Sequence, residues 1–299
     1  MTHPLAGVYA AAPTPLKTDF TPDLESIPRL LDFLARRGCH GALLLGTTGE
    51  GPSFSPAERS DILRAALEVR QAHPDFRLLA GTGTPSLTET VELTRTAFDL
   101  GFNGVVTLPP YYFRQADEDG LFAWFREVIR RGVPGDGHFL GYHIPAQSGV
   151  PLSLDLLARL KDAFPAQFAG IKDSSGDPQN AAALGEHFGD DLLVLTGNDS
   201  LLTYALERHA QGCITALSNL TSPDARAVWD AFRRGGRDPE AQARLDAYRT
   251  VLAQYPPYAV PVKVLLAAEH NFPLWTVRPP LLPMPEARVE SLVQAWRGG

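Results

Sequence analysis

Lysine is scarce in this chain, and positive charge forms no pattern that could bind phosphates. Only four lysines, at positions 17, 161, 172 and 263, contribute to the 27 lysine and arginine residues, and the formal net charge is −7. A nucleic-acid-binding surface needs a basic stripe that neutralises several phosphates. We therefore expect no nucleic-acid partner, and each of the few lysines calls for an explanation.

Cysteine and long apolar runs are also lacking. The two cysteines, Cys39 and Cys213, make no disulfide framework and do not stand at metal-ligand spacing, so we interpret them as small buried hydrophobic residues. No apolar stretch approaches the roughly 18 residues that span a bilayer. Residues 1–15 lack the basic segment and apolar core of a signal peptide. These absences predict no membrane partner and a cytoplasmic location.

The sequence does contain a regular alternation of short apolar runs and longer amphipathic stretches. Runs that are apolar almost throughout are typical of parallel strands covered on both faces. Eight strand–helix repeats predict an α/β fold, the (β/α)8 TIM barrel. The expected strands are residues 7–12, 41–46, 77–81, 104–109, 138–143, 168–172, 192–197 and 213–218.

The C-terminal part has no strand pattern and is expected to form a helical appendage. We divide the chain into a catalytic barrel, residues 1–235, and a C-terminal helical region, residues 236–299. A doubly wound open sheet is the alternative fold. It would require a glycine-rich phosphate-binding turn after the first strand, and "AAPTPLKTD" at 11–19 is not such a turn. Two or three helices are expected in the appendage, at roughly residues 238–254, 259–270 and 285–297.

Serine residues mark the starts of several predicted helices. Ser55, Ser86 and Ser153 each precede a helical pattern and have an acidic residue two or three positions later, which is typical of helix caps. Ser222 is followed by Pro223 and Asp224, and this pattern predicts a further helix start.

Functional residues of such a barrel lie at the carboxyl ends of its strands, and the sixth predicted strand ends in Lys172. A lysine that loses its hydration there is favoured as an uncharged amine, which is a nucleophile able to form a Schiff base with a ketone. The structural alternative is a lysine that extends out of the barrel mouth or pairs with Asp173. The strand ends carry no set of histidines and carboxylates at ligand spacing, so we expect no metal.

Two further strand ends offer groups that complement such a lysine. The second strand leads into "GTTGEG", in which Gly46, Thr47 and Thr48 provide backbone N–H groups and hydroxyls suited to a carboxylate. Tyr142, near the end of the fifth strand, provides a phenol that can move a proton. Taken singly, the turn could be an ordinary connection and the tyrosine could fill the barrel top. Together with Lys172 they match what reversible carbon–carbon chemistry on a 2-oxo acid requires.

The order and spacing of these motifs resemble the dihydrodipicolinate synthase / N-acetylneuraminate lyase family of Schiff-base aldolases. The resemblance covers nearly the whole chain. It is carried by "AAPTPL" (11–16), "GTTGE" (46–50), "AGTG" (80–83), "PPYY" (109–112), "GYHIPAQSG" (141–149), "GIKDSSGD" (170–177), "TGNDS" (196–200) and "VPVK" (260–263).

The resemblance implies roles for individual residues. Lys172 matches the Schiff-base lysine, and Tyr142 matches the catalytic tyrosine that relays the proton. Thr47 and Thr48 match the pair that holds the pyruvate carboxylate, and Thr47 also joins the proton relay. Tyr112 matches a tyrosine that family members insert into the neighbouring subunit's site.

The resemblance also implies the partners of the protein. Thr215 falls where a backbone carbonyl borders the pyruvyl group. The family is usually tetrameric, as a dimer of dimers, and uses no cofactor. Pyruvate and a small aldehyde, or their aldol adduct, are the expected small-molecule partners.

The residues that select the aldehyde match neither named enzyme. Gln147 stands where dihydrodipicolinate synthases carry an arginine that clamps the carboxylate of aspartate semialdehyde. Sialic acid lyases favour an Asp-Glu pair after the seventh strand and a serine on the eighth, whereas this chain has Asp199, Ser200 and Ala216. An arginine from elsewhere, with Arg114 as the first candidate, would weaken the argument from Gln147.

We therefore expect an aldolase that acts on a 2-oxo-3-deoxy sugar acid or a related 4-hydroxy-2-oxo acid, with Gln147 and Asp199 near the aldehyde. The alternatives are dihydrodipicolinate synthase, sialic acid lyase and a dehydratase of the same fold. A non-catalytic barrel that serves as a small-molecule sensor is the alternative from another class.

Overall fold

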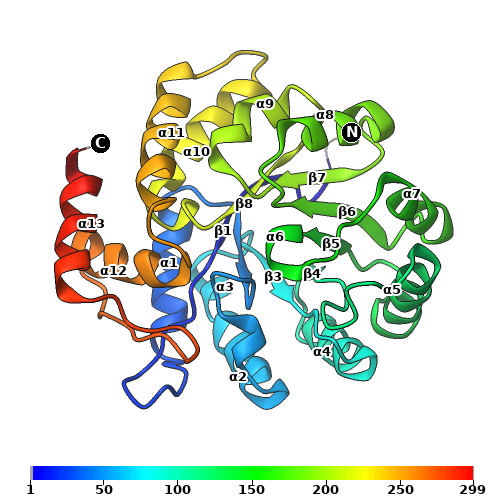
Figure 1. Cartoon of the computed structure of the whole chain (residues 1–299), viewed down its shortest axis with the longest axis horizontal. Helices are drawn as coiled ribbons and strands as arrows, with labels where there is room; N and C mark the ends of the chain where they lie inside the picture. The colour runs from blue at the N-terminus through cyan, green and yellow to red at the C-terminus, as the bar shows by residue number, and fades with distance from the viewer. Residues whose placement is uncertain (1–2, 299) are drawn as a thin grey trace.

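A closed barrel of eight parallel strands forms the centre of the molecule (Figure 1). The computed structural model describes residues 3–298. Each strand pairs with its sequence neighbours, and β8 pairs with β1 to close the barrel. The strands are β1 (Gly7–Ala11), β2 (Gly41–Leu44), β3 (Arg77–Gly81), β4 (Gly104–Thr107), β5 (Phe139–His143), β6 (Phe168–Asp173), β7 (Leu193–Thr196) and β8 (Gly212–Thr215). The predicted TIM barrel is confirmed.

Helices surround the barrel, and three of them, α2, α4 and α7, begin at the expected serine caps. Ser55 forms a capping box with Glu58, while the Ser86 and Ser153 side chains accept backbone N–H groups of α4 and α7. The helices are α1 (Ser26–Arg36), α2 (Pro56–Ala66), α3 (Val69–Ala72), α4 (Leu87–Asp99), α5 (Glu118–Gly132), α6 (Pro145–Ser148), α7 (Leu154–Ala163), α8 (Pro178–Phe188), α9 (Leu202–Leu206), α10 (Ser218–Arg233), α11 (Pro239–Leu252), α12 (Ala259–His270) and α13 (Glu286–Gly298), with short 3₁₀ turns η1 (Gly51–Ser53) and η2 (Asp199–Leu201).

The start expected at Ser222 coincides with a break inside α10. Thr221 has non-helical angles (φ −120°, ψ 26°), so α10 consists of a short helical segment from Ser218 and a longer one that follows Thr221. Pro223 has no N–H to donate to the preceding turn, which is compatible with the first turn of the second segment.

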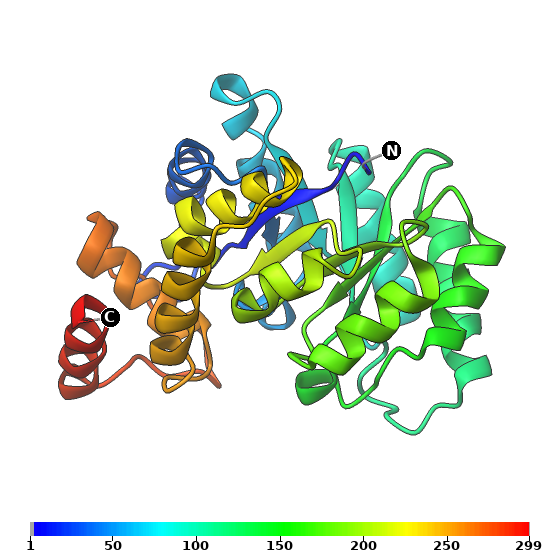
Figure 2. The ribbon, with the colours of Figure 1, turned by 90° about the horizontal axis from the view of Figure 1, so that it is seen from above.

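The C-terminal helices lie together on one side of the barrel (Figures 1 and 2). Helix α10 contacts both α11 and α12, and α13 packs on the same two helices. The domain boundary that we placed near residue 235 falls between α10 and α11. The division into a barrel and an appendage remains our proposal.

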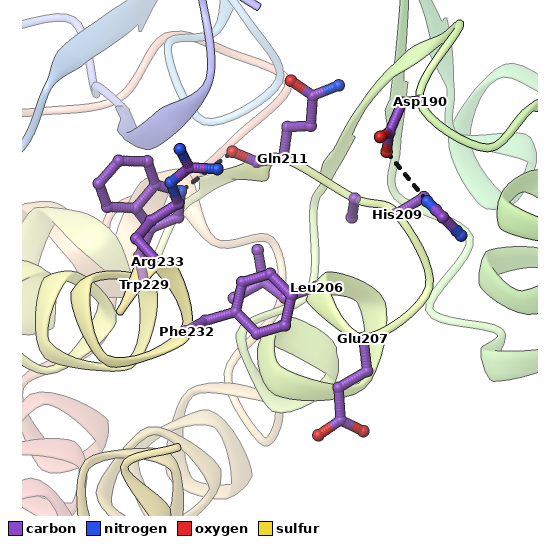
Figure 3. Close-up of a pocket in the computed structure, with 9 residues that line it drawn as sticks. Asp190, Leu206, Glu207, His209, Gln211, Trp229, Phe232 and Arg233 are labelled. Atoms are coloured by element: carbon purple, nitrogen blue, oxygen red, sulfur yellow. Dashed lines mark hydrogen bonds and ion pairs between the residues drawn. The ribbon is translucent and has the colours of Figure 1, made fainter. Parts of the chain in front are cut away.

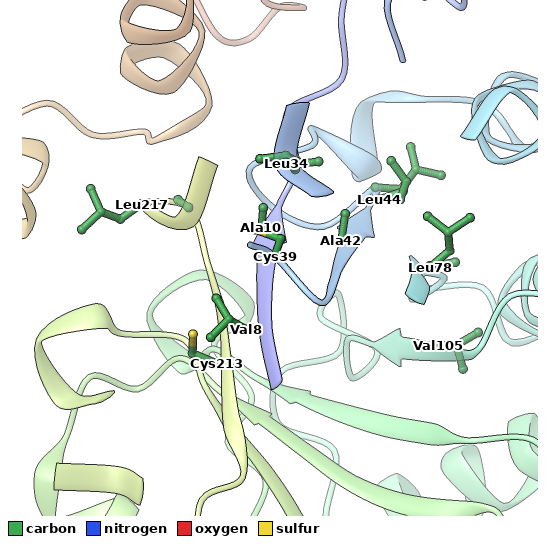
Figure 4. Packing of buried hydrophobic residues seen from close by; sticks show 14 of the residues in the cluster. Val8, Ala10, Leu34, Cys39, Ala42, Leu44, Leu78, Val105, Cys213 and Leu217 are labelled. Carbon is green, nitrogen blue, oxygen red and sulfur yellow. The ribbon is translucent and has the colours of Figure 1, made fainter. Parts of the chain in front are cut away.

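Two apolar layers fill the molecule, one inside the barrel and one between the strands and the helices. The outer layer includes Val8, Ala10, Cys39 and Cys213, so both cysteines are buried as expected (Figure 4). The inner layer closes the barrel interior, and a ligand must therefore bind at one of its ends. Its members are Leu5, Tyr9, Ala11, Leu43, Leu79, Val106, Leu140, Tyr142, Ala169, Leu193, Leu195 and Ile214.

Among residues 3–298, no helix has both the length and the apolar character needed to cross a membrane.

Candidate active site

Lys172 and Tyr142 are partners across the β5–β6 pair, and their polar groups meet inside the barrel mouth. The two residues share a register position, and their side chains are 3% and 4% exposed. Lys172 Nζ donates to Tyr142 Oη at 3.2 Å and lies 4.3 Å from the centroid of the Tyr142 ring. The next register pair is His143 with Asp173, which faces the opposite side of the sheet. The Lys172 amine is thus directed at Tyr142 and away from the Asp173 side chain.

A register shift in β6 aims Lys172 inward. Phe139 is opposite Phe168, but Leu140 is opposite Gly170, so Ala169 is an extra residue in the pairing. Ala169 belongs to the inner apolar layer and Ile171 to the outer one. A regular strand would keep these two residues on one face and turn Lys172 outward. The bulge resets the alternation, and no feature of the sequence had predicted it.

Tyr142 also reaches Thr47, so three polar groups form a row. Thr47 Oγ1 lies 3.2 Å from Tyr142 Oη. Burial by itself would raise the pKa of Tyr142, but the Lys172 ammonium and hydrogen bonds with Thr47, Lys172 and Ser174 outweigh it, so the pKa of this phenol is lowered. We had not identified Ser174 from the sequence. Its position two residues after Lys172, on the same side of the extended chain, is the signal that could have found it.

The turn after β2 presents Thr47 to the mouth of the barrel. Thr48 is buried and Thr47 is exposed, while Gly46 is buried at the start of the turn. The Thr14 hydroxyl donates to the carbonyl of Gly49 at 2.6 Å and ties the turn to the segment after β1. The turn therefore places the hydroxyl of the exposed Thr47 beside Tyr142 and buries the adjacent Thr48.

Tyr112 and Phe113 project from the segment between β4 and α5. Their side chains are 75% and 72% exposed, and their rings meet edge to face at 5.2 Å. Two adjacent aromatic side chains that are exposed in a single chain are typical of a surface that another molecule covers. The structure of one chain is consistent with a role for Tyr112 in a neighbouring subunit.

Gln147 lies in the short helix α6, and its side chain is exposed. Helix α6 ends at Gly149, which has a φ of +67°. A Cβ at this position would lie 2.7 Å from Cδ of Arg114, so the absence of a side chain there makes room for the arginine. Arg114 thus packs against the end of the helix that carries Gln147.

The side chains of Asp199 and Thr215 are buried and hydrogen-bonded to each other. The Asp199 carboxylate is 1% exposed; its Oδ1 accepts from Thr215 Oγ1 at 2.5 Å, and its Oδ2 lies 3.6 Å from Arg249. Thr215 is paired with Ala10 of the outer layer, so its side chain faces the helices. Burial raises the pKa of Asp199, against the opposing effect of Arg249. The carboxylate is therefore buried and hydrogen-bonded in this structure, and its expected contact with an aldehyde stays a prediction.

The other buried or anchored lysines are engaged elsewhere. Lys263 Nζ lies 2.5 Å from Glu50 Oε1, and both side chains are 1% exposed. Lys161 donates to the carbonyls of Pro165 and Phe168, at the start of β6. Neither amine adjoins the row formed by Lys172, Tyr142 and Thr47. Lys172 is therefore the lysine that this site can use.

A cavity of about 350 Å³ lies elsewhere, next to the start of β8 and the end of α10 (Figure 3). Polar groups around it pair with one another: His209 Nδ1 lies 2.9 Å from Asp190, and Trp229 Nε1 donates to the carbonyl of Gln211. It contains none of the candidate residues and lies at the opposite end of the barrel from them. In the described part of the chain, no group of three histidine, cysteine or acidic side chains could hold a metal.

The chain is similar to known proteins over nearly its whole length. The model of the dihydrodipicolinate synthetase family matches residues 4–297. An uncharacterized DapA-like lyase of Chloroflexus aurantiacus is 41% identical over 294 residues, which cover 97% of this chain and 95% of that protein. A 4-hydroxy-tetrahydrodipicolinate synthase of Sorangium cellulosum is 32% identical over 305 residues, with 98% and 96% coverage. The crystal structure of dihydrodipicolinate synthase from Agrobacterium tumefaciens superposes with a TM-score of 0.88 at 30% identity, covering 98% of each chain.

Proposed function

The chain belongs to the dihydrodipicolinate synthetase family and is a lyase of the pyruvate-dependent aldolase type, and we propose that it acts through a Schiff base between Lys172 and pyruvate. One observation carries this proposal. Lys172 Nζ, Tyr142 Oη and Thr47 Oγ1 form a row in which neighbouring atoms are 3.2 Å apart. The row joins an amine nucleophile to a group that can carry a proton.

In the cleavage direction, the Lys172 amine attacks C2 of a 4-hydroxy-2-oxo acid, and the ketone oxygen leaves as water to give an imine. Tyr142, as its phenolate, then accepts the proton of the C4 hydroxyl, the C3–C4 bond breaks, and the aldehyde departs. The electrons of that bond form a C2–C3 double bond while the C2–N π electrons of the protonated imine return to nitrogen, which leaves an enamine on Lys172. Tyr142 returns its proton to C3, and hydrolysis of the imine by water releases pyruvate and restores the amine. The lowered pKa of Tyr142 suits a phenol that must both take and return a proton.

The turn after β2 serves as the carboxylate cradle in this scheme. Thr47 and Thr48 would hold the pyruvate carboxylate through hydroxyl and backbone N–H groups, with Gly46 allowing close approach. The carbonyl of Thr215 would border the pyruvyl group. The exposed hydroxyl of Thr47 beside Tyr142 and the tied-down turn behind it support this assignment.

Tyr112 would act in the site of a second copy of the chain. The exposed Tyr112–Phe113 pair supports an interface between subunits, and a phenol inserted there would extend the row from Thr47. We accordingly propose a homotetramer built as a dimer of dimers.

For the aldehyde, we propose a neutral polyhydroxy compound, so that the substrate is a 2-oxo-3-deoxy sugar acid or a related acid. Gln147 offers an amide, which binds hydroxyl groups well but pairs weakly with a carboxylate. The second candidate is 4-hydroxy-tetrahydrodipicolinate synthase activity, with pyruvate and aspartate semialdehyde as substrates. It is favoured by Arg114, which packs on the helix that carries Gln147 and could supply a positive charge.

Borohydride reduction in the presence of pyruvate tests the Schiff base. The reduced three-carbon fragment is expected on the peptide that carries Lys172 and is expected to be absent from a Lys172→Ala variant. Label on Lys161 or Lys263, or none on the wild-type protein, would contradict the mechanism. A panel of aldehydes with pyruvate, read by product mass, then identifies the partner.

A further inference from the structure

We propose that the buried ion pair between Lys263 and Glu50 positions the carboxylate cradle, so that helix α12 of the C-terminal region sets the affinity of the barrel for pyruvate. The inference rests on the proposed function, because it concerns the turn that was assigned to the pyruvate carboxylate. It gives a purpose to the second buried lysine, which the mechanism does not use.

The ion pair is buried, and the C-terminal region gives each of its two groups a further hydrogen-bond partner. Lys263 Nζ lies 2.5 Å from Glu50 Oε1 and also donates to the carbonyl of Thr276 at 2.7 Å. The other oxygen, Glu50 Oε2, accepts the backbone N–H of Arg278 at 2.8 Å. Since both side chains are 1% exposed, water cannot replace either partner, and removal of one leaves an uncompensated buried charge.

Glu50 belongs to the turn itself, only two positions after Thr48. Its φ is 56°, a left-handed conformation that a side chain of this size adopts only when its surroundings impose it. Its N–H donates to the carbonyl of Thr47 at 3.1 Å, and the neighbouring Gly49 is held by Thr14. The turn is therefore anchored on two sides, through Thr14 to the β1 side and through Glu50 to α12.

The two halves of the pyruvate site consequently depend on different parts of the chain. The nucleophile Lys172 stands on β6, which pairs with β5 in the barrel, whereas Thr47 and Thr48 stand on a turn that α12 holds. A displaced turn should weaken the hold on the carboxylate. It should leave the reactive amine and its partner Tyr142 in place.

The experiment measures borohydride trapping of Lys172 as a function of pyruvate concentration, which needs no knowledge of the aldehyde. Glu50→Asp retains both charges but shortens the link by one methylene, so it is expected to fold and to displace the turn. Glu50→Gln and Lys263→Met each remove one charge, and the double variant removes both. Leu265→Ala is the control, because Leu265 is a fully buried residue of α12 that belongs to the apolar core and not to the ion pair.

We expect Glu50→Asp to raise the half-saturating pyruvate concentration about tenfold, the size of one lost charge-assisted contact, with the same labelling at saturation. Where the single neutral variants fold, the double variant should lie closer to the wild type than either of them, since it buries no lone charge. Leu265→Ala should lose thermal stability with an unchanged pyruvate dependence. The inference is overturned if Glu50→Asp has the wild-type half-saturating pyruvate concentration, or if Leu265→Ala changes that concentration tenfold. In either case the proposed function stands as long as Lys172 of the wild-type protein is labelled. If the wild-type protein is not labelled, both the inference and the proposed function are overturned.

Discussion

The amine of Lys172 lies over the ring of Tyr142, 4.3 Å from its centroid, and also donates to its oxygen. A cationic Lys172 therefore stabilises the phenolate of Tyr142 more than the neutral phenol. The behaviour of Tyr142 with pH can be measured without any substrate.

Tyr142 is expected to ionise at lower pH than an ordinary tyrosine, because its pKa is lowered despite its burial. The difference in tyrosinate absorbance between the wild type and Tyr142→Phe isolates this one residue. Replacing Lys172 by methionine removes the stabilising charge, so the same difference should then move to higher pH. A titration that is identical with and without Lys172 would show that the amine does not control the phenol.

Tyr112→Phe should retain imine trapping at Lys172 and slow turnover by about 10²–10⁴-fold, the usual size of a general acid–base contribution. The reason is that only the hydroxyl is lost, while the ring that fills the contact remains. The double variant Tyr112→Phe with Phe113→Tyr is the matched control, because it moves the hydroxyl by one position and should not restore activity. Full turnover in Tyr112→Phe, or in a protein that stays monomeric, would reject the role across a subunit boundary.

The aldehyde preference should be decided by the charge near α6. With pyruvate, the wild type is expected to give a higher kcat/KM for glyceraldehyde than for aspartate semialdehyde, and Gln147→Arg should shift the ratio toward the semialdehyde by about tenfold.

The variant Arg114→Gln tests whether Arg114, and not the residue at position 147, sets the kcat/KM ratio between glyceraldehyde and aspartate semialdehyde. If the wild type prefers the semialdehyde and Arg114→Gln abolishes the preference, Arg114 is the carboxylate clamp and the synthase is the correct function. If the ratio does not respond to Arg114, the side chain only packs against Gly149.

His40 should make the fold less stable in acid. Burial, followed by the nearby Arg226 and Arg77, lowers the pKa of His40 to about 4, and the Nδ1 atom accepts the N–H of Val8 at 2.9 Å. A histidine in the unfolded chain has a pKa of about 6.5, so on acidification the unfolded state takes up the proton before the folded state does. Stability is therefore lost as the pH falls from about 6.5 to about 4.

His40→Asn, whose amide oxygen can accept the same N–H, should reduce this loss. The melting temperature of the wild type should therefore fall more between about pH 7.5 and about pH 5 than that of the variant. Equal slopes in the wild type and His40→Asn would remove His40 as a cause.

Much of the fold could be predicted because its signals are local. The apolar runs, the interruptions after them and the serine caps at Ser55, Ser86 and Ser153 depend on residues within a few positions of one another, and the structure contains the corresponding elements. The cap-and-proline signal at Ser222 likewise falls directly after the non-helical Thr221, where α10 is broken into two segments.

The sequence by itself determined the barrel, the C-terminal helices and the presence of Lys172, Tyr142 and the "GTTGEG" turn at strand ends, since strand periodicity and motif order survive in one dimension. Only the tertiary structure decided which way those side chains face. The extra residue at Ala169 turns Lys172 inward, the buried Asp199 carboxylate meets the Thr215 hydroxyl, and Lys263 meets Glu50 across 213 positions of the chain. Such relationships depend on register, burial and closure of the barrel, and these arise only when distant segments pack together.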